Sequence, residues 1–355
     1  MKVTTVGLDL AKNVFQVHGV DAHGKKVFNR QLRVAQAAEF FVKLEPCLVA
    51  MEACASAHHW VRRLRAMGHE VRLIAPQYVK AYVKTNKNDA ADAEAICEAA
   101  RQPNMRFVSP KSLEQQAVMA LHALRAGAMK TRTAQANRLR GLLLEYGIAI
   151  AQGIGNVYKR VPDVLADESN DLPDFLRQAL RAEYDQLKLH EQHAQALEAQ
   201  LQRWHRECTA SRAIERVPGF GVLSASALVA SMGDANEFSN GRQVSAWLGI
   251  VPKQHSSGGK QRLLGISKRG DGYLRTLLIH GARSVIAAIQ KRLKAGLDPR
   301  LLSRRERWVL DLLQRRNANV AAVALANKNV RTAWAILAHG TPYEADHVSQ
   351  SPVMA

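Results

Sequence analysis

The sequence lacks any long apolar run, and this absence excludes one class of protein. No stretch of the 355 residues is apolar enough for long enough to cross a lipid bilayer. The opening residues, Met1–Asp9, also lack the apolar core and small-residue cleavage site of a signal peptide. We therefore expect an intracellular, cytoplasmic protein without a membrane partner.

Cysteine is scarce and badly spaced for a disulfide framework or a zinc site. No C-x-x-C pair occurs among Cys47, Cys54, Cys97 and Cys208, so we expect free thiols. The chain also lacks the G-x-x-x-x-G-K-[ST] phosphate loop. Sugar kinases and actin-like ATPases share an opening strand with an aspartate, but the Gly/Thr-rich turn that follows theirs is missing at Leu10–Val14. Nucleotide hydrolysis is not expected.

Acidic residues are outnumbered by basic ones, 31 to 50, which gives a formal net charge of +19. A surplus of this size predicts a polyanionic partner, and nucleic acid is favoured over an anionic membrane. Hydrophobic residues make up 47% of the chain, an ordinary content for a globular protein. The length predicts about two domains with a sizeable core.

The first hundred residues have the pattern of a mixed sheet with helices on its faces. Short apolar runs, several of them β-branched, predict strands at 3–10, 14–20, 25–34, 47–51 and 70–74. Helical patterns lie between and after them, at 35–44, 57–67, 78–83 and 89–101. The expected order is βββαβαβα.

Four carboxylates lie at one edge of that expected fold. Asp9 and Glu52 end two strands, which places both near the rim of an open sheet. Asp89 and Asp92 stand three apart on one helix face and can reach the same rim. Oxygen-only ligands favour Mg²⁺, with Mn²⁺ as the alternative, over zinc. The simpler interpretations are a solvated acidic face and, for Glu52, a pair with a local arginine such as Arg62 or Arg63.

The middle region changes to long helices. One is predicted at Leu113–Tyr146 and another from Pro173 towards Cys208. The second has apolar or aromatic positions three and four apart, typical of a coiled coil, at Leu187, His190, Ala194, Leu197, Leu201, Trp204 and Cys208. Two arrangements fit this seam: a hairpin within the chain, or a crossing to a second subunit.

The third region is predicted to be mostly helical and contains two glycine-rich motifs. V-P-G-F-G at Val217–Gly221 is typical of a helix-hairpin-helix turn that approaches phosphate, and also of a plain helix start. Pro252–Arg262 holds two serines before a glycine pair. A flexible loop that grips phosphates is the simpler interpretation of that stretch. Basic side chains predicted to contact nucleic acid are Lys84, Lys87, Lys260, Arg262, Lys268, Arg269 and Arg275.

These motifs resemble a known family. G-L-D-L-A-K around Asp9, A-M-E-A around Glu52, and K-N-D-A-A-D-A at Asp89 and Asp92 resemble the DEDD transposases of the IS110 insertion-sequence family, which are related to the Piv DNA invertase. Both ends of the chain resemble its IS1111 branch. P-x-x-x-x-S-G followed by S-K-x-G-x-x-x-L-R resembles the family's carboxy-terminal domain, in which Ser257 falls on the nucleophile.

The resemblance implies a domain plan, which we combine with the pattern above. Residues 1–108 would form a RuvC-like domain of the ribonuclease-H type, and 109–211 a helical coiled-coil region for dimerisation. Residues 212–345 would form the transposase domain with its helix-hairpin-helix-like segment, and 346–355 a disordered tail. Asp271 stands where relatives often have asparagine.

The resemblance also implies the chemistry and the partners. Asp9, Glu52, Asp89 and Asp92 would hold Mg²⁺ while Ser257, rather than its neighbour Ser256, attacks a DNA phosphate and forms a phosphoserine link. The two domains would build one composite site. Implied partners are donor and target DNA, a structured non-coding bridge RNA, and further copies of the chain as a homodimer that assembles into a tetramer. Such a protein would act at the bacterial nucleoid.

Two other functions fit the residues alone. One is a hydrolytic, metal-dependent junction or strand nuclease in which Ser257 only touches phosphate. The other is a non-catalytic nucleic-acid-binding protein in which the carboxylates form structural pairs. Metal-dependent strand cleavage separates both enzymes from the binding protein, and a covalent adduct separates the transposase from the nuclease.

Overall fold

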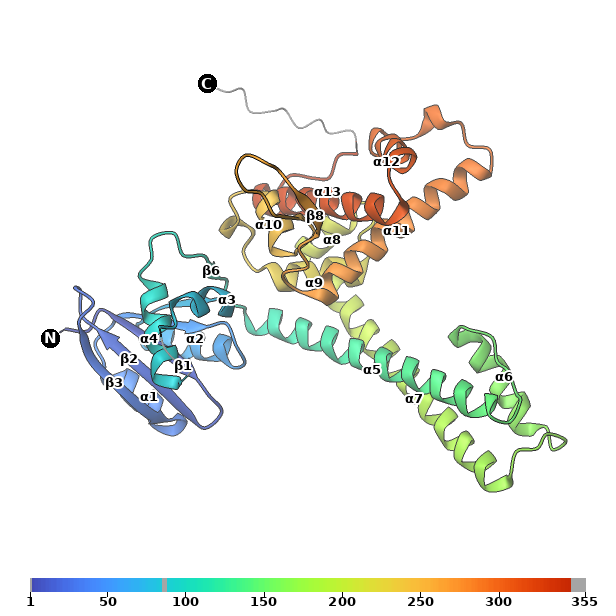
Figure 1. The fold of residues 1–355 in the computed structure, drawn as a ribbon, viewed down its shortest axis with the longest axis horizontal. Coiled ribbons are helices and arrows are strands. Elements are labelled where there is room, and N and C mark those ends of the chain that lie inside the picture. The colour runs from blue at the N-terminus through green and yellow to red at the C-terminus, as the bar shows by residue number, and fades with distance from the viewer. Residues whose placement is uncertain (1, 85–87, 346–355) are drawn as a thin grey trace. The chain divides into compact units, whose positions relative to one another are not determined.

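A computed structural model describes residues 2–84 and 88–345. The chain divides into two compact units between Leu113 and Glu114, and each is described by itself. Figure 1 shows the elements in chain order. None of the helices in the described ranges combines the length and apolar content needed to cross a bilayer.

The first unit is built on a six-stranded sheet in the order β3-β2-β1-β4-β5-β6. Its strands are β1 (Thr5–Leu10), β2 (Val14–Val20), β3 (Lys26–Arg33), β4 (Leu48–Glu52), β5 (Glu70–Ile74) and β6 (Phe107–Val108). β1, β4 and β5 run parallel, whereas β2, β3 and β6 are added antiparallel. The predicted mixed sheet is confirmed, with β6 as an unpredicted strand at one edge.

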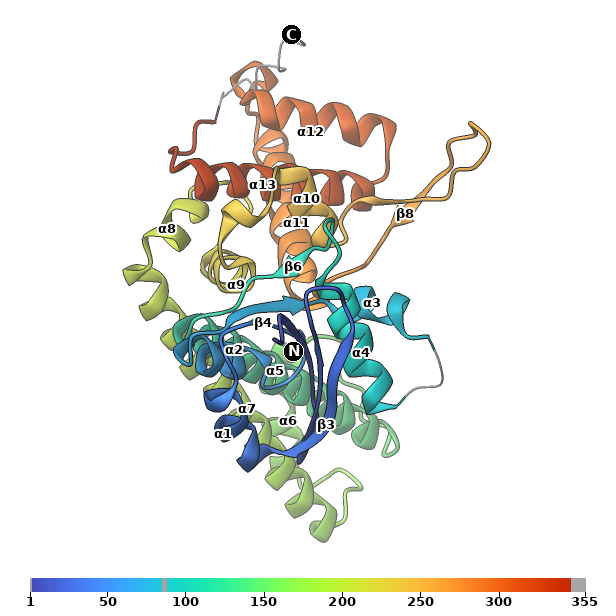
Figure 2. The same cartoon turned by 90° about the vertical axis from the view of Figure 1, so that its left-hand side faces the viewer.

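Helices cover both faces of this sheet, as Figure 2 shows for α1 and α2 on one side and α4 on the other. Their bounds are α1 (Val34–Lys43), α2 (Ala57–Ala66), α3 (Pro76–Val79) with the 3₁₀ turn Lys80–Tyr82, and α4 (Asp89–Ala100). Because strand side chains alternate between faces, Val49 and Met51 join the core under α1 and α2. Ala50, between them, joins the core under α4.

The second unit begins with a helical hairpin of α5 (Leu113–Leu144) and α7 (Asp174–Glu207), with α6 (Ile154–Ala166) between them. Three ion pairs join the two long helices, and partner numbers fall along α7 as they rise along α5: Arg125–Glu198, Arg132–Glu191 and Arg138–Glu183. Within the described chain the helices therefore run antiparallel. Seam residues Leu187, Ala194, Leu197 and Leu201 are buried. The hairpin alternative is the observed one.

The rest of this unit is a helical core with one small β-hairpin. The helices are α8 (Thr209–Glu215), α9 (Val222–Met232), α10 (Gly241–Trp247), α11 (Gly272–Lys294), α12 (Arg304–Arg315) and α13 (Ala318–His339), with 3₁₀ turns at Ala235–Glu237 and Pro299–Leu301. Strands β7 (Pro252–Gln254) and β8 (Leu263–Ile266) pair antiparallel. The mostly helical character is as predicted, whereas the two strands were not predicted.

A buried histidine ties α5 to this core. The Ser226 hydroxyl donates to the Val222 carbonyl at 2.6 Å and so accepts from Nε2–H of His122 at 3.0 Å. Nδ1 of His122 then accepts from the Tyr273 hydroxyl at 3.0 Å. Burial, helped by Arg125, lowers the pKa of His122 to about 4, so the ring is neutral at pH 7. The network links α5, α9 and α11.

Candidate active site

Asp9 and Glu52 stand side by side at the carboxyl ends of β1 and β4. The parallel register pairs Leu8 with Met51, which makes Asp9 and Glu52 the next neighbours along the two strands. Both residues are half-buried. The pKa of the nearby Cys54 thiol is raised by burial first, and then by the negative charges of Glu52 and Asp9. The two carboxylates thus share one local environment at the sheet rim.

Helix α4 brings two more carboxylates. It begins at Asp89 because the side chain of Asn88 accepts the Ala91 N–H at 2.8 Å, an N-cap. Asp89 and Asp92 therefore occupy the first turn, where the helix dipole stabilises negative charge. Like charges on one face destabilise the helix, so the pair needs more than local propensity to explain it.

The packing of α4 on β1 sets where that first turn lies. A Cβ on Gly7 would lie 2.1 Å from the Ala93 carbonyl oxygen, and Sγ of Cys97 lies 3.9 Å from the Thr5 carbonyl oxygen. Four helical residues rise about 6 Å and two strand residues about 6.6 Å. The same register, continued one turn towards the start of α4, brings Asp89 level with Asp9. The register thus predicts that Asp89 lies near Asp9 at the sheet rim, with Asp92 in the same first turn of α4.

The side chains do not form a preassembled metal cage. Among the residues that the structure describes, no three or more His, Cys, Asp or Glu side chains are grouped closely enough to hold a metal ion. The donor set still fits a hard divalent cation in its chemistry, because all four groups are carboxylates. Asp9 and Glu52 are neighbours by strand register, and Asp89 and Asp92 by helix spacing.

Gly7 offers a test of this packing. We expect Gly7→Ala to destabilise the first unit by about 1–3 kcal/mol, because the added Cβ meets the backbone of α4, which cannot rotate away. Strand cleavage should fall with it, since α4 carries Asp89 and Asp92. Thermal unfolding of the full chain measures the first effect. The control is Gly127→Ala in α5, where a Cβ meets open space; an equally stable Gly7→Ala variant would contradict the register.

The basic residues predicted beside α4 have different outcomes. The Lys84 ammonium pairs with the Glu94 carboxylate at 3.0 Å, and the two side chains are 63% and 42% exposed. A surface pair of this kind contributes little to stability and can exchange for a phosphate. Lys87 lies outside the described residues.

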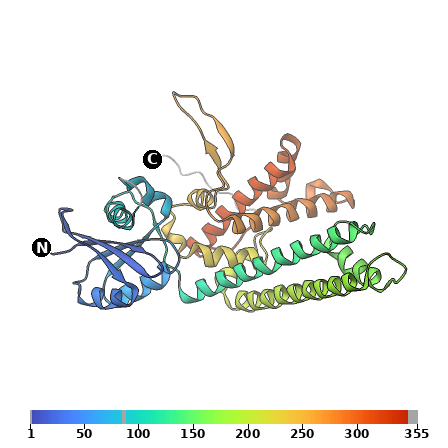
Figure 3. The ribbon, with the colours of Figure 1, turned by 60° about the horizontal axis from the view of Figure 1, so that its bottom comes forward.

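The predicted nucleophile lies in the β7–β8 hairpin, residues 252–266, which we call the serine hairpin. Its turn is Gly258–Gly259, with φ of +53° and +76°, and the Lys260 N–H donates to the Ser257 carbonyl at 3.0 Å. This is a two-residue type I′ turn, which glycine pairs favour. Residues 252–265 are exposed, and Figure 3 shows the hairpin projecting from the helices of its unit. The segment predicted as a loop is a β-hairpin with a defined turn, and Ser257 lies directly before that turn.

The two adjacent serines differ in their contacts. The Ser256 hydroxyl accepts the Arg262 N–H across the hairpin at 3.2 Å. The Ser257 hydroxyl makes no hydrogen bond within the described part of the chain, and none joins it to His255, whose N–H donates to the Arg262 carbonyl at 2.9 Å. Ser256 is thus part of the hairpin's structure, and the Ser257 hydroxyl is exposed to a ligand.

The base of the serine hairpin is tightly packed. A Cβ on Gly249 (φ +71°) would lie 2.0 Å from the Arg269 carbonyl oxygen, and the Arg275 guanidinium donates to the Leu248 and Arg269 carbonyls at 3.1 and 3.2 Å. Asp271 caps α11 by accepting the Tyr273 N–H at 2.7 Å, a role that asparagine fills equally well. Arg275 therefore has a structural role, whereas the other predicted contacts of this region are exposed: Lys260, Arg262, Lys268 and Arg269.

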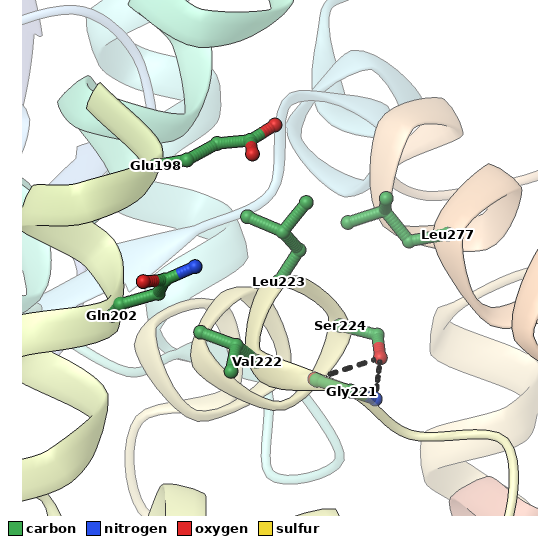
Figure 4. A pocket seen from close by; sticks show the side chains of 7 residues that line it. All are labelled: Glu198, Gln202, Gly221, Val222, Leu223, Ser224 and Leu277. Atoms are coloured by element: carbon green, nitrogen blue, oxygen red, sulfur yellow. Dashed lines mark hydrogen bonds between the residues drawn. The ribbon is translucent and has the colours of Figure 1, made fainter. Parts of the chain in front are cut away.

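The glycine-rich turn at Val217–Gly221 is used for packing. Gly219 (φ +103°) lies against Gly281 and Asn329, and the Asn329 amide donates to the Pro218 carbonyl at 2.8 Å. The Gly221 N–H donates to the Ser224 hydroxyl at 3.0 Å. Figure 4 shows the neighbouring cavity of about 270 Å³. The carboxylate of Glu198 lines it, which disfavours an anion there, so the helix-start interpretation accounts for these glycines.

Known proteins match segments of both units. Residues 6–148 match a family model of DEDD transposases of the IS110 type, and residues 211–297 match the transposase IS116/IS110/IS902 family. The first match contains the four carboxylates, and the second contains Ser257.

Three relatives are similar along nearly their whole length. A probable family 20 transposase of Pseudomonas aeruginosa is 53% identical over 97% of this chain and 99% of its own. The transposase for insertion sequence element IS1111A of Coxiella burnetii is 42% identical over 96% of this chain and 91% of its own. The transposase for insertion sequence element IS1328 of Yersinia enterocolitica is 38% identical over 96% of this chain and 98% of its own.

Proposed function

Because the chain belongs to the IS116/IS110/IS902 family of insertion-sequence transposases, we propose that it cuts and rejoins DNA with Ser257 as the nucleophile. The observation that carries this proposal is the position of Ser257, exposed before a type I′ turn and flanked by cations, inside the matched segment. The test is the formation of a covalent DNA–protein adduct at this residue.

The proposed reaction exchanges one ester bond for another. Oγ of Ser257 attacks a backbone phosphorus, forming an O–P bond while the P–O bond to one sugar breaks; the serine proton is lost to a base and the leaving alkoxide takes up a proton. Attack by a second DNA hydroxyl reverses these changes and frees the serine. Because the number of phosphoester bonds is unchanged, rejoining needs no ATP, in agreement with the missing phosphate loop.

The four carboxylates would hold the metal. Asp9 and Glu52 would supply oxygens from the strand ends, and Asp89 and Asp92 from the first turn of α4. Mg²⁺ or Mn²⁺, when bound, neutralises phosphate charge and makes the reacting oxygens better nucleophiles and leaving groups. We also propose that the first unit, which carries these carboxylates, is a RuvC-like domain.

The IS1111-like motifs extend the proposal to partners. A structured bridge RNA would select donor and target DNA by base pairing, and the chain would work as a homodimer assembling into a tetramer at the nucleoid. The net charge of +19 supports a partner with many phosphates.

Binding should depend steeply on salt. Each phosphate neutralised on duplex DNA contributes about −0.9 to the slope of log K against log salt concentration. With several exposed cations on the serine hairpin and its base, we expect a slope of about −4 or steeper. Titration from low to physiological salt measures it, and a slope near zero would contradict an electrostatic mode of binding.

A hydrolytic nuclease is the second candidate. It is favoured by one observation, that no histidine or carboxylate is hydrogen-bonded to the Ser257 hydroxyl among the described residues. In that case water attacks the phosphate and no adduct forms.

A further inference from the structure

Helix α12 concentrates positive charge where a helix tolerates it least. Its first turn contains Arg304, Arg305 and Arg307, next to the positive end of the helix dipole, where cations are unfavourable. Glu306 is the acidic residue of that turn, and it pairs with Arg292 of α11 and accepts the Ser303 N–H. The unfavourable interaction of these arginines with the helix dipole must therefore be offset by interactions outside the helix itself.

Helix α13 adds two cations to the same place. The Lys328 ammonium lies 4.6 Å from the ring centre of Trp308 on α12. Burial lowers the pKa of Lys328, and so do the guanidiniums of Arg305, Arg304 and Arg331. Every charged group that shifts this amine is therefore positive.

One of these arginines is partly buried and the others face solvent. Arg305 donates to Asn329 at 3.0 Å and to Thr332 at 3.1 Å, which fixes α12 against α13. Arg304 and Arg331 are exposed and Lys328 is half-buried. We call Arg304, Lys328 and Arg331 the α12–α13 cluster. Within the described ranges none of the three has an ion pair with a carboxylate.

The cluster is attached to the base of the serine hairpin. Asn327, next to Lys328 in the chain, donates to the Ile250 carbonyl at 3.2 Å, just before β7. A Cβ on Gly241 of α10 would lie 2.9 Å from Cα of Arg331, so α10, which leads into β7, rests on the same helix. A nucleic acid held at the cluster is therefore held on the scaffold that positions Ser257.

Gathering like charges costs free energy that an anionic ligand offsets. We infer that the α12–α13 cluster is a phosphate-binding surface for the backbone of the nucleic acid, separate from the basic residues of the serine hairpin. This inference rests on the proposed function. Contacts of this kind fix position and register without reading sequence, so the cluster would strengthen binding to specific and random duplexes alike.

The test compares two full-length variants with equal charge change. One carries Arg304→Gln, Lys328→Gln and Arg331→Gln. The control carries Lys159→Gln, Arg181→Gln and Arg203→Gln on α6 and α7, where these side chains are exposed. Affinity for a DNA duplex and for an RNA duplex of equal length is measured over a range of salt, together with the unfolding temperature.

We expect the cluster variant to bind at least about tenfold more weakly at 0.15 M salt. The slope of log K against log salt concentration should become less negative by about 2–3, because each phosphate that the variant no longer neutralises accounts for about 0.9. Its unfolding temperature should stay equal or rise, because charge repulsion is relieved. The duplex for which the variant loses more affinity relative to the wild type identifies the nucleic acid, DNA or RNA, that the cluster holds.

Three results would overturn the inference. They are unchanged slopes on both duplexes, an equal loss of affinity in the control, or weaker binding explained by a fall in unfolding temperature. Each leaves the proposed function standing, because that is judged separately by adduct formation at Ser257. A wild-type chain that binds neither duplex would remove both.

Discussion

Asp9→Asn and Glu52→Asn are each expected to reduce strand cleavage and rejoining by on the order of 10²–10³ or more, the loss typical of removing one group that stabilises transition-state charge. Asparagine keeps the shape of Asp9 and removes its charge, so the proposed cation would lose an anionic ligand at the sheet rim. Nucleic-acid binding should stay near wild type, because affinity comes mainly from lysines and arginines. Recombination of a donor and target plasmid in Mg²⁺ measures the effect.

The same change at Asp89 or Asp92 should abolish activity and also weaken α4. A carboxylate in the first turn stabilises a helix by about 0.3–1 kcal/mol, so the unfolding temperature must be measured beside activity. Glu98→Gln is the matched control, because Glu98 lies near the end of the same helix, away from the rim. Partial recovery at high Mn²⁺ would identify weakened metal binding as the cause. A variant that recombines at the wild-type rate would take its residue out of the site.

Much of the first unit could be predicted because its strands are buried runs of apolar residues. Val6 and Leu8 are fully buried, and the parallel pairing of β1 with β4 follows from the βαβ order. Asp9 and Glu52 then fall together by register alone. Strand β6 could not be predicted, since Phe107–Val108 is too short to show a period of two; it is defined by its pairing with Leu73 and Ile74.

The serine hairpin escaped prediction for a different reason. Its strands are exposed on both faces, including Leu263 at 64% and Leu264 at 43%, so they lack the apolar alternation that identifies a half-buried strand. One local signal was present. Gly258–Gly259 is a pair that type I′ turns favour, and it indicates the hairpin when it is given more weight than the missing apolar pattern.

The seam of α7 shows what spacing cannot decide. Apolar positions three and four apart pack equally well against a helix of the same chain or of a second copy. In the structure α5 of the same chain packs on this seam, and Arg125–Glu198 and Arg138–Glu183 pair the two helices in an antiparallel register. Helix existence was therefore predictable, and the partner of the helix was not.

Ser257→Ala is expected to abolish the covalent adduct, cleavage and rejoining while DNA and RNA binding stay near wild type. The variant removes one exposed hydroxyl that holds no part of the hairpin together, so the fold should be unaffected. Ser256→Ala is the matched control. It removes an acceptor for the Arg262 N–H, which should cost about 0.5–1.5 kcal/mol or less at an exposed site and reduce activity only mildly.

The hydroxyl of Ser257 is a poor nucleophile at neutral pH unless a base or metal activates it. No such group is hydrogen-bonded to it among the described residues, so the proposed mechanism has the hydroxyl activated only when DNA and metal are bound, which would suppress stray cleavage by the isolated chain. The direct measurement is to stop the reaction with denaturant, digest the protein and look for nucleotide mass on the peptide that contains residue 257. Wild-type cleavage by Ser257→Ala, with no adduct on either protein, would establish water as the nucleophile and the hydrolytic nuclease as the function.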